Sequence, residues 1–203
     1  MSASAILFGT WFAGPALFAA LYVSDAVCTV AAARLYKRGA NQHVVFEGSY
    51  ELTPYHQKNV DALRTFTPRF FVALVAMEAL LIVLSTVSHQ HPGLEPIYAV
   101  GLGSPILTEC AIHVRHARNI FFFRSVLEGG VAGQIRYDRM HVLRASAMDI
   151  LAFAAIYLLL FVALGEWFFL GGALGCVVLG LKHRAMARKH QRQRSLATPG
   201  GAT

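Results

Sequence analysis

The chain has 203 residues and a formal net charge of +7, with 14% charged and 56% hydrophobic residues. A soluble domain carries about 25% charged residues, so this composition excludes a soluble basic protein that binds nucleic acid and predicts a protein of the lipid bilayer. The three cysteines are widely spaced in apolar segments, which predicts neither a disulfide framework nor a Cys-x-x-Cys metal site.

Five apolar segments approach the length of about 20 residues that a membrane-spanning helix needs. The second starts at Thr67 and Pro68, a helix cap followed by a favourable first residue. The third contains two glycines and a proline at residues 101–105, which predict a kink or a broken turn. The fifth carries Gly171 and Gly175, a spacing that lets a neighbouring backbone approach closely. The predicted spans are residues 15–36, 68–88, 96–118, 145–164 and 168–183.

All 18 lysines and arginines fall into three segments, residues 34–69, 115–144 and 182–194, with six in each. Five spans place all three segments on one side of the membrane, and basic segments stay in the cytoplasm. We therefore expect the N-terminus outside, the C-terminus in the cytoplasm, and contacts with anionic lipids of a prokaryotic plasma membrane. A four-span alternative, with the last two apolar segments as one hairpin, keeps the same sidedness. Residues 1–189 are predicted to form a single membrane domain, followed by a disordered tail at 190–203.

The fold class is an all-α integral membrane protein with short strands and helices in its two cytoplasmic loops. In the first loop, residues 44–52 alternate and predict a short strand centred on 48–52, followed by a helix from Thr53 to Arg64. In the second, residues 133–137 predict another short strand. Each strand lies between a helix that enters the cytoplasm and one that leaves it. The two halves are therefore candidates for a parallel repeat whose strands pair with each other.

Four predicted spans carry one carboxylate each, namely Asp25, Glu78, Glu109 and Asp149. At about 1.5 Å per residue, each lies roughly 7–13 Å from the nearest arginine at the cytoplasmic end of its span. All four are therefore expected in one layer of the cytoplasmic half of the membrane. Ionisable groups inside a span are costly and usually face the interior of the bundle.

Histidines accompany these acids. Glu109, His113 and His116 follow one another at helical spacing, so they share one face of the third span. A carboxylate and two imidazoles, with a water as fourth ligand, are a possible zinc site. Other polar residues near the same layer are candidates to support the site: Thr29, Ser146, Arg115 and Tyr157.

Three functions are compatible with this pattern. The leading chemical hypothesis is a cation or proton pathway through Asp25, Glu78, Glu109 and Asp149, in which a protein of only five spans would require a homo-oligomer. The first alternative is a zinc-dependent membrane enzyme that acts on a lipid-like substrate through Glu109, His113 and His116. The second is a non-catalytic scaffold or accessory subunit in which the acids form structural ion pairs with arginines. Of the two classes, the sequence favours a protein without enzymatic activity over an enzyme.

Overall fold

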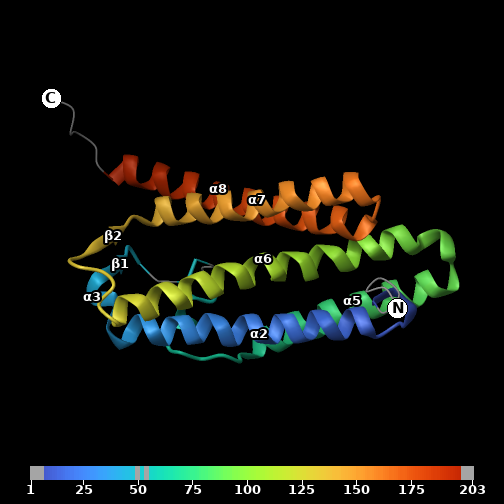
Figure 1. The fold of residues 1–203 in the computed structure, drawn as a ribbon, viewed down its shortest axis with the longest axis horizontal. Helices are drawn as coiled ribbons and strands as arrows, with labels where there is room; N and C mark the ends of the chain where they lie inside the picture. Colours follow the sequence, from blue (N-terminus) through green and yellow to red (C-terminus); the bar gives the residue numbers. More distant parts are fainter. Residues whose placement is uncertain (1–6, 49–50, 53–54, 198–203) are drawn as a thin grey trace.

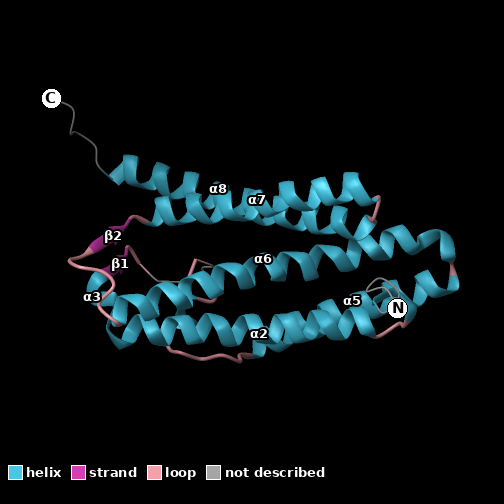
Figure 2. Ribbon diagram, viewed as in Figure 1, coloured by secondary structure: helices cyan, strands magenta, loops and turns pink. Residues whose placement is uncertain are grey.

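Five long helices, each apolar enough to cross a membrane, make up most of the chain (Figures 1 and 2). The computed structural model describes residues 7–48, 51–52 and 55–197. The five predicted spans are confirmed as helices of spanning length, which favours them over the four-span alternative. The helices are α2 (Ala13–Leu35), α5 (Pro68–Gln90), α6 (Glu95–Leu127), α7 (Arg139–Leu164) and α8 (Trp167–Ala197).

Side-chain caps fix where two of these helices begin. Thr67 Oγ1 accepts a hydrogen bond of 3.3 Å from the Phe70 N–H, which caps α5 at its predicted start. Asp138 Oδ1 accepts one of 2.7 Å from the Met140 N–H and caps α7 in the same way. Because of this cap, α7 starts at Arg139, before the predicted boundary at residue 145. Similarly, α8 stays helical to Ala197, so residues 190–197 of the predicted disordered tail belong to a helix.

The first span ends in an irregular turn. After Leu35 the chain enters a π-helical turn, η1 (Tyr36–Ala40), which is kinked at Gly39 where φ is 147°. A single short turn of helix, α3 (Asn41–His43), then leads into the first strand. This left-handed backbone favours glycine, and it turns the chain out of the helix axis.

The helix α6 lies in the middle of the bundle (Figure 1). Helices α2 and α5 pack on one side of it, and α8 packs on the other side and carries α7. Gly165, with φ of 71°, ends α7 and starts the tight turn into α8. We call the end of the bundle where α2 and α6 finish and α7 begins the basic end, because arginines from all three basic segments lie there. They are Arg34 in the last turn of α2, Arg124 in the last turn of α6, and Arg194 of α8, which pairs with Asp138 at the start of α7.

The contact between α6 and α8 depends on glycines. A Cβ atom on Gly103 of α6 would lie 1.9 Å from the carbonyl oxygen of Phe168, and one on Gly171 of α8 would lie 2.2 Å from that of Val100. The predicted close approach of a backbone to Gly171 is therefore confirmed. Of the predicted kink or broken turn, the broken turn is wrong, because α6 continues as one helix through Pro105. The glycines before Pro105 instead make room for α8.

Two short strands join the halves of the chain at the basic end (Figure 2). The strand β1 (Val44–Phe46) pairs in parallel with β2 (Ile135–Tyr137), in the register Val44 to Ile135 and Phe46 to Tyr137. β1 lies before the strand centre expected at residues 48–52, of which 49–50 are outside the described residues. β2 falls within the expected 133–137. The following helix, α4 (Gln57–Asp61), is shorter than expected, and its predicted start at 53–54 is also outside the described residues.

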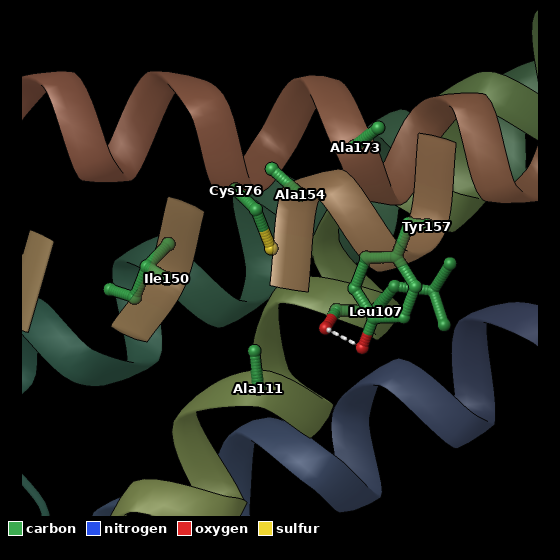
Figure 3. Packing of buried hydrophobic residues seen from close by; sticks show 7 residues of the cluster. All are labelled: Leu107, Ala111, Ile150, Ala154, Tyr157, Ala173 and Cys176. Carbon is green, nitrogen blue, oxygen red and sulfur yellow. Dashed lines mark hydrogen bonds between the residues drawn. The ribbon is translucent and has the colours of Figure 1, made fainter. Parts of the chain in front are cut away.

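The largest buried cluster fills the space between α6, α7 and α8 (Figure 3). Within it, the Tyr157 hydroxyl donates a hydrogen bond of 3.0 Å to the carbonyl oxygen of Leu107. Because α6 contributes that carbonyl, Tyr157 ties α7 to the central helix although α7 packs mainly on α8. The cluster is composed of Leu107, Ala111, Ile150, Ala154, Tyr157, Ala173 and Cys176.

Candidate functional site

An acid and a histidine meet where α2 crosses α6. His116 Nε2 lies 2.6 Å from Asp25 Oδ1, a distance at which the ring N–H donates a strong hydrogen bond to the carboxylate. Thr29 Oγ1, one turn along α2 from Asp25, lies 3.2 Å from the same nitrogen. The other ring nitrogen of His116, Nδ1, is buried and has no hydrogen-bond partner among the described residues. The predicted supporting residue Thr29 is therefore in contact with this pair.

A second histidine and a second acid lie beside this pair. His113 Nδ1 donates a hydrogen bond of 2.7 Å to the main-chain oxygen of Glu109. The other ring nitrogen of His113, Nε2, forms a hydrogen bond with the Ser24 hydroxyl of α2. The Glu109 side chain is buried, and in the part of the chain that the structure describes, its Oε2 has no hydrogen-bond partner. Glu109 is also close enough to Asp25 for the two carboxylates to interact electrostatically. We call Asp25, Glu109, His113 and His116 the acid–histidine cluster.

The cluster borders a large cavity that extends toward the basic end. Its volume is about 700 Å³, which is within the range of small-molecule binding sites. Asp25, Thr29 and His116 form part of its wall, whereas Glu109 does not line it. The remaining wall comes from other residues of α2 and α6, from α5, α7 and α8, from both strands, and from the segment between β1 and α5. The cavity therefore extends from Asp25 in the middle of α2 to the segments that carry β1 and β2.

The part of the cavity wall that α7 and α8 form carries another buried polar pair. Ser146 of α7 and His183 of α8 are joined by a hydrogen bond of 2.7 Å, and each is at most 5% exposed. Ser146 was predicted from the sequence, but His183 was not, because the predicted span ended at that residue. Arg115, also predicted, lines the same cavity. Tyr157 does not line it, because its hydroxyl is directed to Leu107 within the α6–α7–α8 cluster.

Two of the four predicted acids are placed elsewhere. Asp149 of α7 faces α6 on the side away from the acid–histidine cluster, where its Oδ2 lies 2.9 Å from Nη2 of Arg118. Glu78 of α5 is half-buried, and no hydrogen bond joins its Oε1 to any residue that the structure describes. Neither residue lines the 700 Å³ cavity. The four acids thus do not form one continuous group.

The proposed zinc ligands are near one another along α6, but their ligand atoms do not gather. Among the described residues, the ligand atoms of Glu109, His113 and His116 do not all lie within 4.8 Å of one another. Both ring nitrogens of His113 are occupied by protein hydrogen bonds. This geometry gives no support to a zinc site at these three residues.

A different cluster, which sequence reasoning missed, lies at the basic end. Ligand atoms of Glu47, Asp138 and His190 lie within 4.8 Å of one another. Arg194 of α8 already pairs with both acids, contacting Glu47 at 3.5 Å and Asp138 more closely. The Met140 N–H, followed by Arg194, lowers the pKa of the Asp138 carboxyl below its ordinary value. The group therefore acts as an ion-pair network that holds β1, α7 and α8 together. The sequence signal for it is an acid directly after each strand.

Comparison of the chain with protein-family models, with curated proteins and with solved structures finds no match. What the site does must therefore be inferred from its own residues.

Proposed function

We propose that this multi-pass membrane protein binds and moves protons or small cations, with the acid–histidine cluster as the binding site. The observation that carries the proposal is the Asp25–His116 contact of 2.6 Å at the wall of the cavity, beside the buried Glu109. Two carboxylates inside a membrane repel each other, and binding a proton or a cation removes that repulsion. His116 Nδ1, which has no hydrogen-bond partner among the described residues, gives the acid–histidine cluster a further atom that can accept a proton.

The route has access from one end. On the cavity side, Asp25 and His116 are reached from the basic end. On the other side, the bundle is filled by a buried apolar cluster that packs α2, α5 and α6 together. Because this packing closes the far side, the arrangement favours a carrier that changes conformation over a permanently open channel. The cluster is composed of Phe18, Leu81, Tyr98, Leu102 and Ile106.

The proposal includes an orientation. The basic end, where arginines from all three basic segments lie, faces the cytoplasm, and the turns that lack lysine and arginine face outward. The cavity then opens to the cytoplasm, where anionic lipids surround it. A reporter protein that is active only in the cytoplasm is expected to be active when it is fused after Thr203. Activity of the periplasmic type at that end would refute the orientation.

Flux through reconstituted protein tests the function. The purified chain in liposomes that contain a pH-sensitive dye is exposed to a pH step or to a gradient of a monovalent cation. Asp25→Asn and Glu109→Gln are expected to abolish the flux, because each removes a carboxylate from the cluster. Asp149→Asn, a carboxylate of similar depth outside the cluster, is expected to retain it. Equal flux in Asp25→Asn and the parent protein, with both folded, would contradict the proposal.

A structural role is the second candidate, and the Arg118–Asp149 contact of 2.9 Å favours it. Such a pair holds neighbouring helices in register without any chemistry. In that case the parent protein gives no flux, and substitutions at Asp25 and Asp149 lower stability by similar amounts. The liposome experiment, combined with an unfolding measurement on each variant, separates the two functions.

A further inference from the structure

The 700 Å³ cavity has a composition that the proton or cation pathway does not require. Its lining contains three arginines and four histidines but only two carboxylates, one of which is the Asp25 that already pairs with His116. Arg118 also contacts Asp149, which lies outside the cavity lining. Three guanidinium groups against two carboxylates give the lining more formal positive than negative charge, and guanidinium groups match the geometry of phosphate. The basic and imidazole groups are Arg64, Arg115, Arg118, His56, His116, His141 and His183.

Aromatic side chains form the rest of the wall near the membrane surface. They come from β1, from the last turns of α6 and from β2, and they surround the cavity on the side of the strands. Phe121 lines the cavity and is 76% exposed, so this ring reaches from the cavity to the surface of the bundle. Aromatic rings at this depth favour contact with the boundary between hydrocarbon and headgroups. The aromatic lining residues of these elements are Phe46, Phe121, Phe122, Phe123 and Tyr137.

The cavity reaches the surface between α6 and α7. These two helices touch little, because α7 packs on α8 instead. Phe121 and Arg118 on α6, and His141 and Ala145 on α7, line the cavity and are exposed. A molecule that lies in the lipid layer therefore has a lateral route to the arginine and histidine side chains without passing through the loops.

We propose that this cavity binds a phosphate-bearing amphiphile. The phosphate lies near Arg115 and His183, and the hydrocarbon chain leaves between α6 and α7 along Phe121. The anionic phosphate group of such a headgroup, a phosphate monoester, is shared with inorganic phosphate, but the aromatic wall and the lateral opening favour the amphiphile. The proposal goes beyond ion movement and does not rest on it, because Arg115, His183 and Ala145 lie outside the acid–histidine cluster.

Binding to the full-length protein in dodecyl maltoside micelles tests the proposal. The probe is radiolabelled oleoyl lysophosphatidic acid, with unlabelled oleoyl lysophosphatidylcholine and inorganic phosphate as competitors. Only unlabelled lysophosphatidic acid is expected to displace the probe. Displacement by lysophosphatidylcholine would show that the cavity selects the chain alone, and displacement by inorganic phosphate would show a site for free anions. Either result overturns the proposal.

Variants locate the site. Arg115→Gln is expected to weaken binding about ten- to a hundred-fold, because it removes a charge-assisted contact to phosphate. Arg136→Gln removes an exposed arginine of the nearby strand β2 that does not line the cavity, and it is expected to leave binding unchanged. Ala145→Trp fills the lateral opening from an exposed position of α7 and is expected to abolish binding even if Arg115→Gln does not fold. Equal loss in Arg115→Gln and Arg136→Gln, or full binding in Ala145→Trp, would refute the site.

The two proposals fail separately. Asp25→Asn is expected to remove ion flux but to keep lysophosphatidic acid binding, because it removes a negative charge from the lining. Loss of binding in Ala145→Trp with normal flux would support the amphiphile site as an independent site. No binding by the parent protein, with normal flux, would refute the amphiphile and leave the ion pathway standing.

Discussion

Replacing Gly103 of α6 by alanine is expected to destabilise the bundle by forcing α6 and α8 apart. The new Cβ would lie 1.9 Å from the carbonyl oxygen of Phe168, about 1.5 Å short of the 3.4 Å at which ordinary contacts begin. That oxygen belongs to the backbone of α8, so it cannot rotate away as the end of a flexible side chain does. Relief therefore requires that one helix shift as a whole.

The cost follows from the packing that this shift loosens. Helix association in a membrane depends largely on van der Waals contacts, and a gap of about 1 Å removes up to half of the attraction of each atom pair. Overpacking of this kind costs about 1–3 kcal/mol, and contact with backbone places Gly103→Ala at the upper end. Alanine returns about 1 kcal/mol through its higher helix propensity. We therefore expect a net loss of about 2 kcal/mol.

Unfolding by dodecyl sulfate in mixed micelles, followed by circular dichroism, measures this loss. Gly93→Ala is the matched control, because a Cβ at Gly93 meets nothing within 4 Å. Gly171→Ala, whose Cβ would lie 2.2 Å from the Val100 carbonyl oxygen, is expected to behave like Gly103→Ala. Because both substitutions push the same two helices apart, the double variant is expected to lose less than the sum of the two. A Gly103→Ala protein as stable as Gly93→Ala would refute the close approach of α6 and α8.

Two further predictions concern polar groups. Ser146→Ala leaves Nδ1 of the buried His183 without its hydrogen-bond partner. We expect the free energy of unfolding to fall by about 1–3 kcal/mol in the same measurement. Unchanged stability would show that the hydrogen bond does not hold α7 on α8. The Met140 N–H, and then Arg194, keep the pKa of Asp138 below its ordinary 3.8. Asp138 therefore stabilises the fold above pH 3.8, and this contribution is lost as the pH falls through the lower pKa of the folded state. Unfolding measured between pH 6 and pH 3 is expected to show a smaller decline in Asp138→Asn, and an identical decline would refute the assignment.

The number of spans was predictable because hydropathy is a local property of the chain. A run of about 20 apolar residues needs a helix across the membrane whatever its neighbours are. The start of α5 was predictable because Thr67 caps it. The start of α7 and the end of α8 were missed because both helices extend beyond their apolar segments. The effect of residues 101–105 was misjudged because the same glycines that weaken a helix also admit a neighbouring helix.

The site was predictable only in part, because depth and direction are different quantities. Counting residues from the arginines gives the depth of an acid, and it placed Asp25, Glu78, Glu109 and Asp149 in one layer. The direction in which each acid points depends on which helices are neighbours, and helices that are apolar on every side carry no signal for this. The structure brings Asp25 to His116, while it directs Asp149 to Arg118.

The parallel pairing of β1 with β2 has a consequence for synthesis. Val44 pairs with Ile135, so β1 leaves the ribosome 91 residues before its partner does. At about 5–20 residues per second, an exposed strand edge waits roughly 5–20 s for completion. During that interval α5 and α6 are synthesised, and β1 offers its unpaired backbone groups to any other strand. Neighbouring nascent copies of this chain are then its natural competitors, so low expression favours correct folding of this protein.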